Sequence, residues 1–191
     1  MTNVQLVPAT QNDGEERSIP DAGDFSRRLY LDDLQVGQRF QSHWYLIEAE
    51  EIKRFASHFD PQPFHLDEEA ARKSFFGGLA ASGWHTGAVA MKLLAEDGYP
   101  LADGIIGLGA EIFWPRPTRP GDFLRLESEV VEICPSKSKP NQAVVVIEIT
   151  MLNQNSESVF NARAKLLAFG RDCRVARPTD RDLASPIAVS I

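Results

Sequence analysis

Residues 82–96 read SGWHTGAVAMKLLAE, and this stretch sets the expected architecture. From Trp84 onward almost every position is apolar or small, and Lys92 and Glu96 supply nearly all of its charge. A helix that is apolar on nearly all sides is a buried helix. Ser82 is of a residue type that caps helix N-termini. The stretch therefore predicts a buried helix at the centre of the molecule.

The segments around this helix predict β-strands and one further helix. Strands are expected at 38–46, 105–113, 123–133, 143–151 and 159–169, because these runs are rich in β-branched and aromatic residues and are bounded by turn residues. A helix is expected over 47–58, ending before Pro61. The last strands have short connections, which favour antiparallel pairing. The predicted fold class is α+β, with an antiparallel sheet wrapped around a long buried central helix.

Length and composition indicate a single domain with two loose ends. A chain of 191 residues suits one domain of ordinary size. Residues 1–28 are polar and turn-prone, which predicts a flexible N-terminal arm, and 171–191 predict a C-terminal tail of the same kind. The globular domain is expected to span residues 29–170.

The charge balance restricts the partners. The chain carries 20 Lys and Arg against 27 Asp and Glu, a net charge of −7. Such a balance argues against a nucleic-acid or anionic-membrane surface, which needs clustered positive charge. No window approaches the roughly 18 apolar residues of a membrane span, and the first 28 residues lack the pattern of a secretory signal. We therefore expect a cytoplasmic protein that binds neither nucleic acid nor membrane.

Residues 59–67, FDPQPFHLD, are the first candidate for chemistry. Two prolines restrict the backbone, so the segment is expected to be a stiff, non-helical loop that holds Asp60 and His65 at a fixed separation. An Asp with a His is suited to moving protons to and from water near neutral pH. The alternative is that Asp60 caps a turn and His65 is structural. The residues alone leave both interpretations open.

Residues 76–85, FGGLAASGWH, are the second candidate. They form a Gly-rich turn that enters the N-terminus of the central helix, where the first amides lack internal partners and attract negative charge. Gly83 has no side chain, so a ligand oxygen could approach its N–H and find an oxyanion hole. Taken alone, however, the segment favours a tight turn into a core helix with Ser82 as its N-cap.

Together the two segments resemble the MaoC-like family of hot-dog-fold enoyl-thioester hydratases and dehydratases. The family signature, Asp-x-Asn-Pro-aliphatic-His-x-Asp, is matched by DPQPFHLD at 60–67 and is followed by Phe76-Gly77 and Ser82-Gly83. Leu34-x-Val36-Gly37 and residues 117–124, PTRPGDFL, are also similar to family features. The resemblance covers about residues 30–169, and the order and spacing of its pieces make the joint match fairly specific.

The resemblance implies a hot-dog homodimer, or a higher homo-oligomer, that acts on a coenzyme A or carrier-protein thioester without a metal or redox cofactor. Asp60 and His65 match the catalytic pair, and Gly83 matches the backbone donor to the thioester carbonyl. Gln62 stands where the family has Asn, and Ser82 where it often has His. The residues expected to contact the substrate are Gln62, Phe76, Gly77, Ser82 and Trp84.

Two other function classes remain open. A thioesterase on this fold would need a carboxylate on the central helix, and the helical candidates, Glu96 and Asp97, lie at its far end. A non-catalytic module that binds acyl thioesters would tolerate loss of Asp60 or His65, and neither is lost. An assay that follows both the enoyl group and free thiol would separate hydration, hydrolysis and binding.

Three further functional interpretations have weaker support in the sequence. His58, His65 and His85 with Asp60 and Asp67 could be imagined as a metal site, but their spacing fits no familiar ligand pattern, so no metal is expected. Residues 72–73 and 137–139 are positive spots that could receive phosphates, although solvated surface charge is favoured. Trp84 could line an acyl pocket, but the apolar bulk that a helix needs against a sheet favours a core position.

Overall fold

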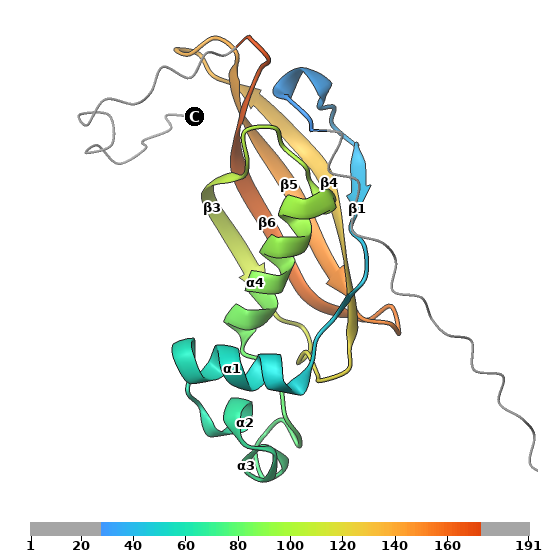
Figure 1. Cartoon of the computed structure of the whole chain (residues 1–191). Coiled ribbons are helices and arrows are strands. Elements are labelled where there is room, and N and C mark those ends of the chain that lie inside the picture. The colour runs from blue at the N-terminus through green and yellow to red at the C-terminus, as the bar shows by residue number, and fades with distance from the viewer. Residues whose placement is uncertain (1–27, 173–191) are drawn as a thin grey trace, which may run out of the picture.

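A curved antiparallel sheet, a helix lying against it and a group of short helices at one end make up the chain (Figure 1). The computed structural model describes residues 28–172, so the predicted arm and tail lie almost wholly outside the described residues. The strands are β1 (Arg39–Gln41), β2 (Tyr45–Leu46), β3 (Ile106–Phe113), β4 (Phe123–Pro135), β5 (Gln142–Leu152) and β6 (Ser158–Phe169). The helices are α1 (Ala49–Phe59), α2 (Pro63–Leu66), α3 (Glu68–Arg72) and α4 (Gly83–Leu93), with short turns at Leu31–Asp33 and Leu94–Gly98.

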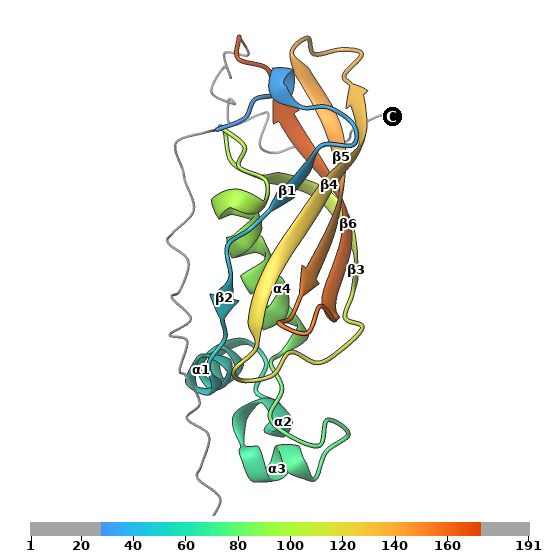
Figure 2. The same ribbon diagram turned by 90° about the vertical axis from the view of Figure 1, so that its right-hand side faces the viewer.

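The sheet has the strand order β1-β4-β5-β6-β3, and β2 also pairs with β4. All of these pairings are antiparallel. β4 alternates between buried and half-buried residues, which is typical of a strand with one face on the core. Figure 2 shows the sheet curving around α4. The predicted α+β class, a sheet wrapped around a central helix, is confirmed.

α4 packs one face against the sheet and leaves the other exposed in the single chain. Ser82 is its N-cap, as predicted, and its hydroxyl accepts a hydrogen bond from the Trp84 N–H. The buried residues of α4 are His85, Thr86, Val89, Ala90 and Leu93. On the opposite face the side chains of Trp84 and Met91 are 64% and 52% exposed. The expectation of a helix buried on all sides is therefore wrong for the isolated chain.

The predicted non-helical loop at 59–67 is also wrong. α1 ends at Phe59, with Asp60 as its C-cap before Pro61, as expected, but Pro63 then begins the short helix α2. Proline is well tolerated at the first helical position, because its missing N–H would have no partner there and its φ already suits a helix. α3 follows directly and was not predicted. Its N-cap is Asp67, whose carboxylate accepts from the Ala70 N–H.

The four long strands begin and end within two residues of the predicted bounds. The expected strand at 38–46 is instead divided into β1 and β2 by Ser42, His43 and Trp44. The division has a local cause, because the Ser42 hydroxyl accepts from the Leu126 N–H at 2.9 Å while the Ser42 N–H donates to the Leu126 carbonyl. A side-chain oxygen thus replaces a backbone acceptor in the ladder with β4.

Candidate active site

Three elements meet at the end of the sheet where α4 begins (Figure 1). Asp60 is the C-cap of α1, His65 lies in α2, and Ser82 is the N-cap of α4. The two prolines at 61 and 63 set the chain direction between the first two of these residues. The structure therefore brings together side chains from the two segments singled out in the sequence.

His65 is buried and its ring orientation is fixed. Its Nδ1 lies 2.7 Å from the carbonyl oxygen of Ala80, and only 4% of the residue is exposed. Because a carbonyl can only accept, Nδ1 carries the hydrogen, and the neutral imidazole presents a lone pair at Nε2. Nε2 lies 3.5 Å from Oδ2 of Asp60.

Both oxygens of Asp60 are held by neutral donors. The Ser82 hydroxyl donates to Oδ2 at 2.6 Å, and the Gln62 side-chain amide donates to Oδ1 at 2.7 Å. Partial burial raises the pKa of Asp60, but these two hydrogen bonds and the electrostatic influence of the nearby His65 ring together bring that pKa below its ordinary value. Asp60 is therefore a carboxylate at neutral pH.

Gly83 is the first residue of α4 and directly follows Ser82, whose hydroxyl binds Asp60. Within residues 28–172 its N–H has no hydrogen-bond partner, as is usual for the first turn of a helix. Its carbonyl accepts from the indole Nε1 of Trp114 at 2.8 Å. A Cβ at position 83 would lie 3.1 Å from the Trp114 ring, so the close approach of the indole favours glycine there.

Of the other residues expected at the site, Phe76 borders His65, whereas Gly77 and Trp84 lie elsewhere. The Phe76 ring lies 6.1 Å from the His65 ring and borders it. Gly77 occupies an exposed turn at φ 63°, a conformation that glycine adopts without strain, and makes no described contact with Asp60 or His65. Trp84 contacts the Trp114 ring at 5.7 Å. The expected core position of Trp84 is wrong, because its face of α4 points away from the sheet.

Sequence analysis did not assign a role to Trp114. Its indole reaches Gly83 across 31 residues of chain, and no periodicity or spacing signals such a contact. An aromatic residue directly before Pro115 was the only available hint, and it is a weak one.

His85 belongs to a separate buried group. Its ring stacks on Phe55 with centroids 4.5 Å apart, and its Nε2 lies 3.6 Å from Oε1 of Glu51, which also accepts from the Tyr45 hydroxyl. Burial lowers the pKa of His85, although the nearby Glu51 carboxylate opposes that shift. His85 therefore packs against α1 and makes no described contact with the Asp60–His65 pair.

The two positively charged segments, 72–73 and 137–139, either lie far from Asp60 and His65 or form ion pairs with neighbouring acids. Residues 137–139 belong to the β4–β5 hairpin at the opposite end of the sheet (Figure 1). Arg72 and Lys73 form ion pairs with Glu68 and Glu69 one turn earlier. In the described part of the chain no group of three His, Cys, Asp or Glu side chains could hold a metal ion, and no helix there is long and apolar enough to cross a membrane.

The wrapped sheet, the central helix and the Asp-His pair at its N-terminus define a hot-dog-fold protein. Residues 33–151, more than half of the chain, match the MaoC like domain. The chain belongs to the MaoC-like family.

The chain is similar to proteins from three named organisms. It is 33% identical over 141 residues to the uncharacterized protein YdeM of Bacillus subtilis, which covers 73% of this chain and 98% of that protein. The crystal structure of a MaoC-like dehydratase from Rhodospirillum rubrum is 58% identical, with a TM-score of 0.74 over 75% of this chain and 98% of the other. The unliganded R-hydratase PhaJ1 of Pseudomonas aeruginosa is 28% identical, with a TM-score of 0.61 over 75% and 87% of the two chains.

Proposed function

We propose that this protein is a hydratase or dehydratase that interconverts an enoyl thioester and a 3-hydroxyacyl thioester of coenzyme A or a carrier protein. The observation that carries the proposal is the 3.5 Å approach of His65 Nε2 to Asp60 Oδ2. Similarity to a MaoC-like dehydratase and to an R-hydratase supports the same reaction class.

The pair is suited to hold one water molecule. In the neutral imidazole Nε2 is an acceptor, and the Asp60 carboxylate is also an acceptor. A water that donates one hydrogen to each group directs its oxygen lone pair away from both of them. That oxygen attacks the β-carbon of the enoyl group, the pair takes up one proton from the water, and it returns a proton to the α-carbon. Dehydration follows the same steps in reverse.

Gly83 supplies the complementary donor. Hydration builds negative charge on the thioester carbonyl oxygen, and the free Gly83 N–H at the helix N-terminus stabilises it. Removal of one such donor typically costs about 3–4 kcal/mol in the transition state. In this scheme the coenzyme A or carrier-protein thioester is the substrate, and no further cofactor enters a step.

The thioesterase alternative lacks a carboxylate in the right place. Glu96 and Asp97 lie in the Leu94–Gly98 turn at the far end of α4. Asp97 Oδ2 accepts from the backbone N–H of His43 at 2.8 Å, and Glu96 Oε2 lies 3.5 Å from His43 Nε2. These carboxylates connect α4 to the segment between β1 and β2, and neither faces Gly83.

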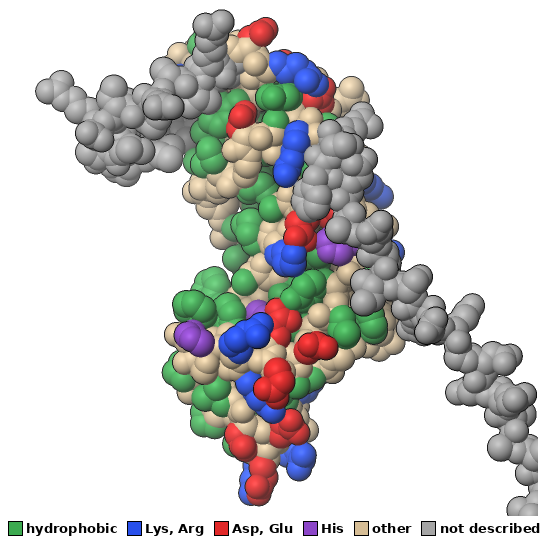
Figure 3. Space-filling view, viewed as in Figure 1, with side chains coloured by type: hydrophobic (Ala, Val, Ile, Leu, Met, Phe, Trp, Pro, Cys, Tyr) green, Lys and Arg blue, Asp and Glu red, His purple; other side chains and the backbone are tan. Residues whose placement is uncertain are grey.

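We also propose that two copies of the chain pair along β3. Within the described sheet β3 is an edge strand that pairs with β6 alone. Apolar side chains lie beside that edge and on α4, including Phe113 at 62% and Trp84 at 64% exposure. Figure 3 shows hydrophobic side chains exposed on the face that carries α4. An open edge beside exposed apolar residues is typical of an interface, and a two-fold copy would cover both.

The activity is tested with crotonyl-coenzyme A. Purified protein is incubated with this thioester while the enoyl absorbance and the release of free thiol are followed together. The proposal predicts loss of enoyl absorbance without thiol release. Thiol release would identify a thioesterase, and no change in either signal would identify a binding module.

A further inference from the structure

The side chain of Arg119 binds the loop that precedes α4. Its guanidinium donates to the carbonyl oxygens of Phe76 at 2.5 Å, Gly78 at 2.7 Å and Leu79 at 3.0 Å. These three acceptors come from a segment about 40 residues earlier in the chain. One side chain thus fixes the path of residues 76–79.

The segment that follows residues 76–79 is held from its other side by α2, the helix that contains His65. The Ala80 carbonyl accepts from His65 Nδ1 at 2.7 Å, and the Ala80 N–H donates to the Phe64 carbonyl at 3.4 Å. One residue later the Ala81 N–H donates to the Thr118 carbonyl at 2.9 Å. Residues 76–81 therefore lie between His65 on one side and the turn that carries Arg119 on the other.

The Arg119 guanidinium has no acidic partner among residues 28–172. Arg119 is half-buried. Its backbone N–H donates to Oδ2 of Asp122 at 2.7 Å, and this hydrogen bond fixes the turn from which the side chain extends. A half-buried guanidinium needs acceptors, and carbonyls supply them here. The planar fork of arginine can reach several carbonyls at once, whereas a lysine ammonium is a single point donor.

We propose that Arg119 is a positioning residue for His65 and for the start of α4. By holding the Phe76, Gly78 and Leu79 carbonyls, it presents the next carbonyl, that of Ala80, to His65 Nδ1, and so selects the tautomer with a free Nε2 lone pair toward Asp60. The kinetic part of this inference rests on the proposed hydratase function, whereas the effect on the His65 ring does not.

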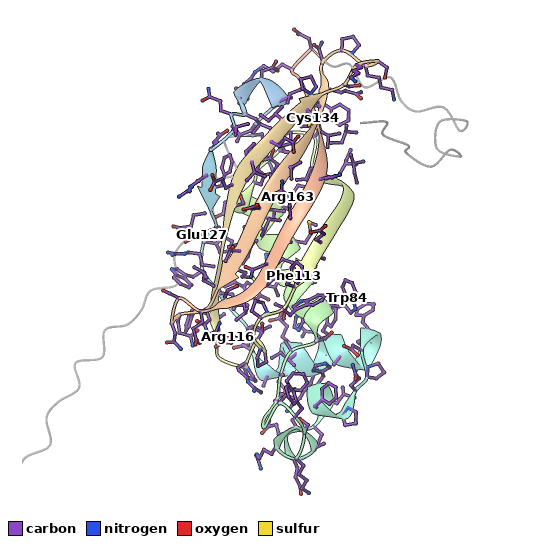
Figure 4. The ribbon with its side chains drawn as sticks, turned by 180° about the vertical axis from the view of Figure 1, so that it is seen from behind. Trp84, Phe113, Arg116, Glu127, Cys134 and Arg163 are labelled. Carbon is purple, nitrogen blue, oxygen red and sulfur yellow. The ribbon has the colours of Figure 1, made fainter. Side chains whose placement is uncertain are left out.

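The test compares Arg119→Met, Arg119→Lys and a matched control, Arg116→Met. Arg116 lies on the surface three residues earlier and forms one exposed ion pair with Glu157 at 3.4 Å (Figure 4). Imidazole ¹⁵N NMR reports the His65 tautomer, and the chain has only four histidines, so His65→Gln assigns its signals. Crotonyl-coenzyme A hydration gives kcat and KM for each variant.

Arg119→Met is expected to shift the His65 ring signals toward a mixture of tautomers and to lower kcat by about 10- to 100-fold, the range that slight misplacement of a catalytic group produces. KM is expected to change little, since the described hydrogen bonds of the guanidinium all go to backbone carbonyls of the chain itself. Arg119→Lys should recover part of both effects, and Arg116→Met should match the wild type.

A wild-type His65 spectrum in folded Arg119→Met would overturn the inference, whatever the activity. If the wild type does not hydrate the thioester, the proposed function fails, and the His65 signals still decide the role of Arg119. If Arg119→Met does not fold, Arg119→Lys decides: a wild-type spectrum and kcat in that variant contradict the proposal, and intermediate values support it.

Discussion

Ser82 shows how much one small side chain contributes at this site. Its hydroxyl donates to Asp60 and accepts from the Trp84 N–H, so it holds the carboxylate and caps α4 at once. At the position where the family often has His, this chain therefore has a residue that binds the carboxylate of Asp60. Gln62, one methylene longer than the usual Asn, likewise reaches the other oxygen of Asp60.

Ser82→Ala is expected to raise the pKa of Asp60 toward its ordinary value, because one of the hydrogen bonds that lower it is removed. The acidic limb of the kcat/KM profile for hydration should therefore move to higher pH. A lowered pKa stabilises the folded state above the unfolded pKa, and this contribution disappears as the pH falls through the folded value. The difference in Tm between wild type and variant should accordingly shrink at low pH.

Ser57→Ala is the matched control, because the Ser57 hydroxyl lies on the exposed side of α1 and donates to the Arg54 carbonyl. It should leave the acidic limb in place. An unchanged limb in Ser82→Ala as well would mean that Ser82 does not control the ionisation of Asp60.

Site residues that lie in a continuous motif could be predicted from the sequence. Residues that only the fold brings to the site could not. The DPQPFHLD stretch and the Ser82-Gly83 step made Asp60, His65 and Gly83 candidates through the resemblance to the MaoC-like family. Arg119 and Trp114 reach the site over 31 residues or more of chain. Contacts of this range depend on how β3 and the turn after it pass α4, which local patterns do not encode.

At the scale of elements, the long strands were predictable because alternation and flanking prolines both mark them. The helices near the site were harder. Proline ends α1 by restricting the residue before it, yet the next proline starts α2, and the sequence does not say which effect dominates. α2 and α3 have only four and five residues, too few for a periodic signal.

Two glycines on and after α4 give opposite expectations for stability. A Cβ at Gly98 would lie 2.7 Å from Leu126 Cδ2 and 3.0 Å from the Leu93 carbonyl oxygen. Leu126 is fully buried and has little room to move, so Gly98→Ala should destabilise the protein by about 1–3 kcal/mol. A Cβ at Gly87 would make an ordinary 3.7 Å contact with Phe160.

Gly87→Ala should therefore leave stability unchanged or raise it by up to about 1 kcal/mol, because alanine favours a helix interior. Urea denaturation at one fixed protein concentration measures both variants. Equal stability of Gly98→Ala and the wild type would contradict the packing described for the end of α4.

At the scale of the whole molecule, the outer face of the sheet and the face of α4 differ in character. Charged side chains such as Glu127 and Arg163 project from the sheet, whereas Trp84 and Phe113 lie where β3 ends beside α4 (Figure 4). Arg163 is paired with Glu148 at 2.6 Å on that outer surface. The apolar side therefore suits a second copy, and the charged side suits solvent.

Phe113→Asp is expected to shift the protein from dimer to monomer, because it places a charge in the proposed apolar interface. Light scattering after size-exclusion chromatography measures the mass. Phe75→Asp is the control, since Phe75 is 99% exposed in the loop after α3 and lies outside that surface. A wild-type monomer, or equal masses for both variants and the wild type, would show that β3 is not the interface.

The central claim is that Asp60 and His65 act together on one water molecule. The most direct measurement is the rate of crotonyl-coenzyme A hydration by Asp60→Asn and by His65→Gln, with circular dichroism to show that both variants are folded. The account predicts that each substitution lowers kcat by at least about 100-fold, as expected for loss of a general acid–base group. Hydration at a near-normal rate by either folded variant would contradict it.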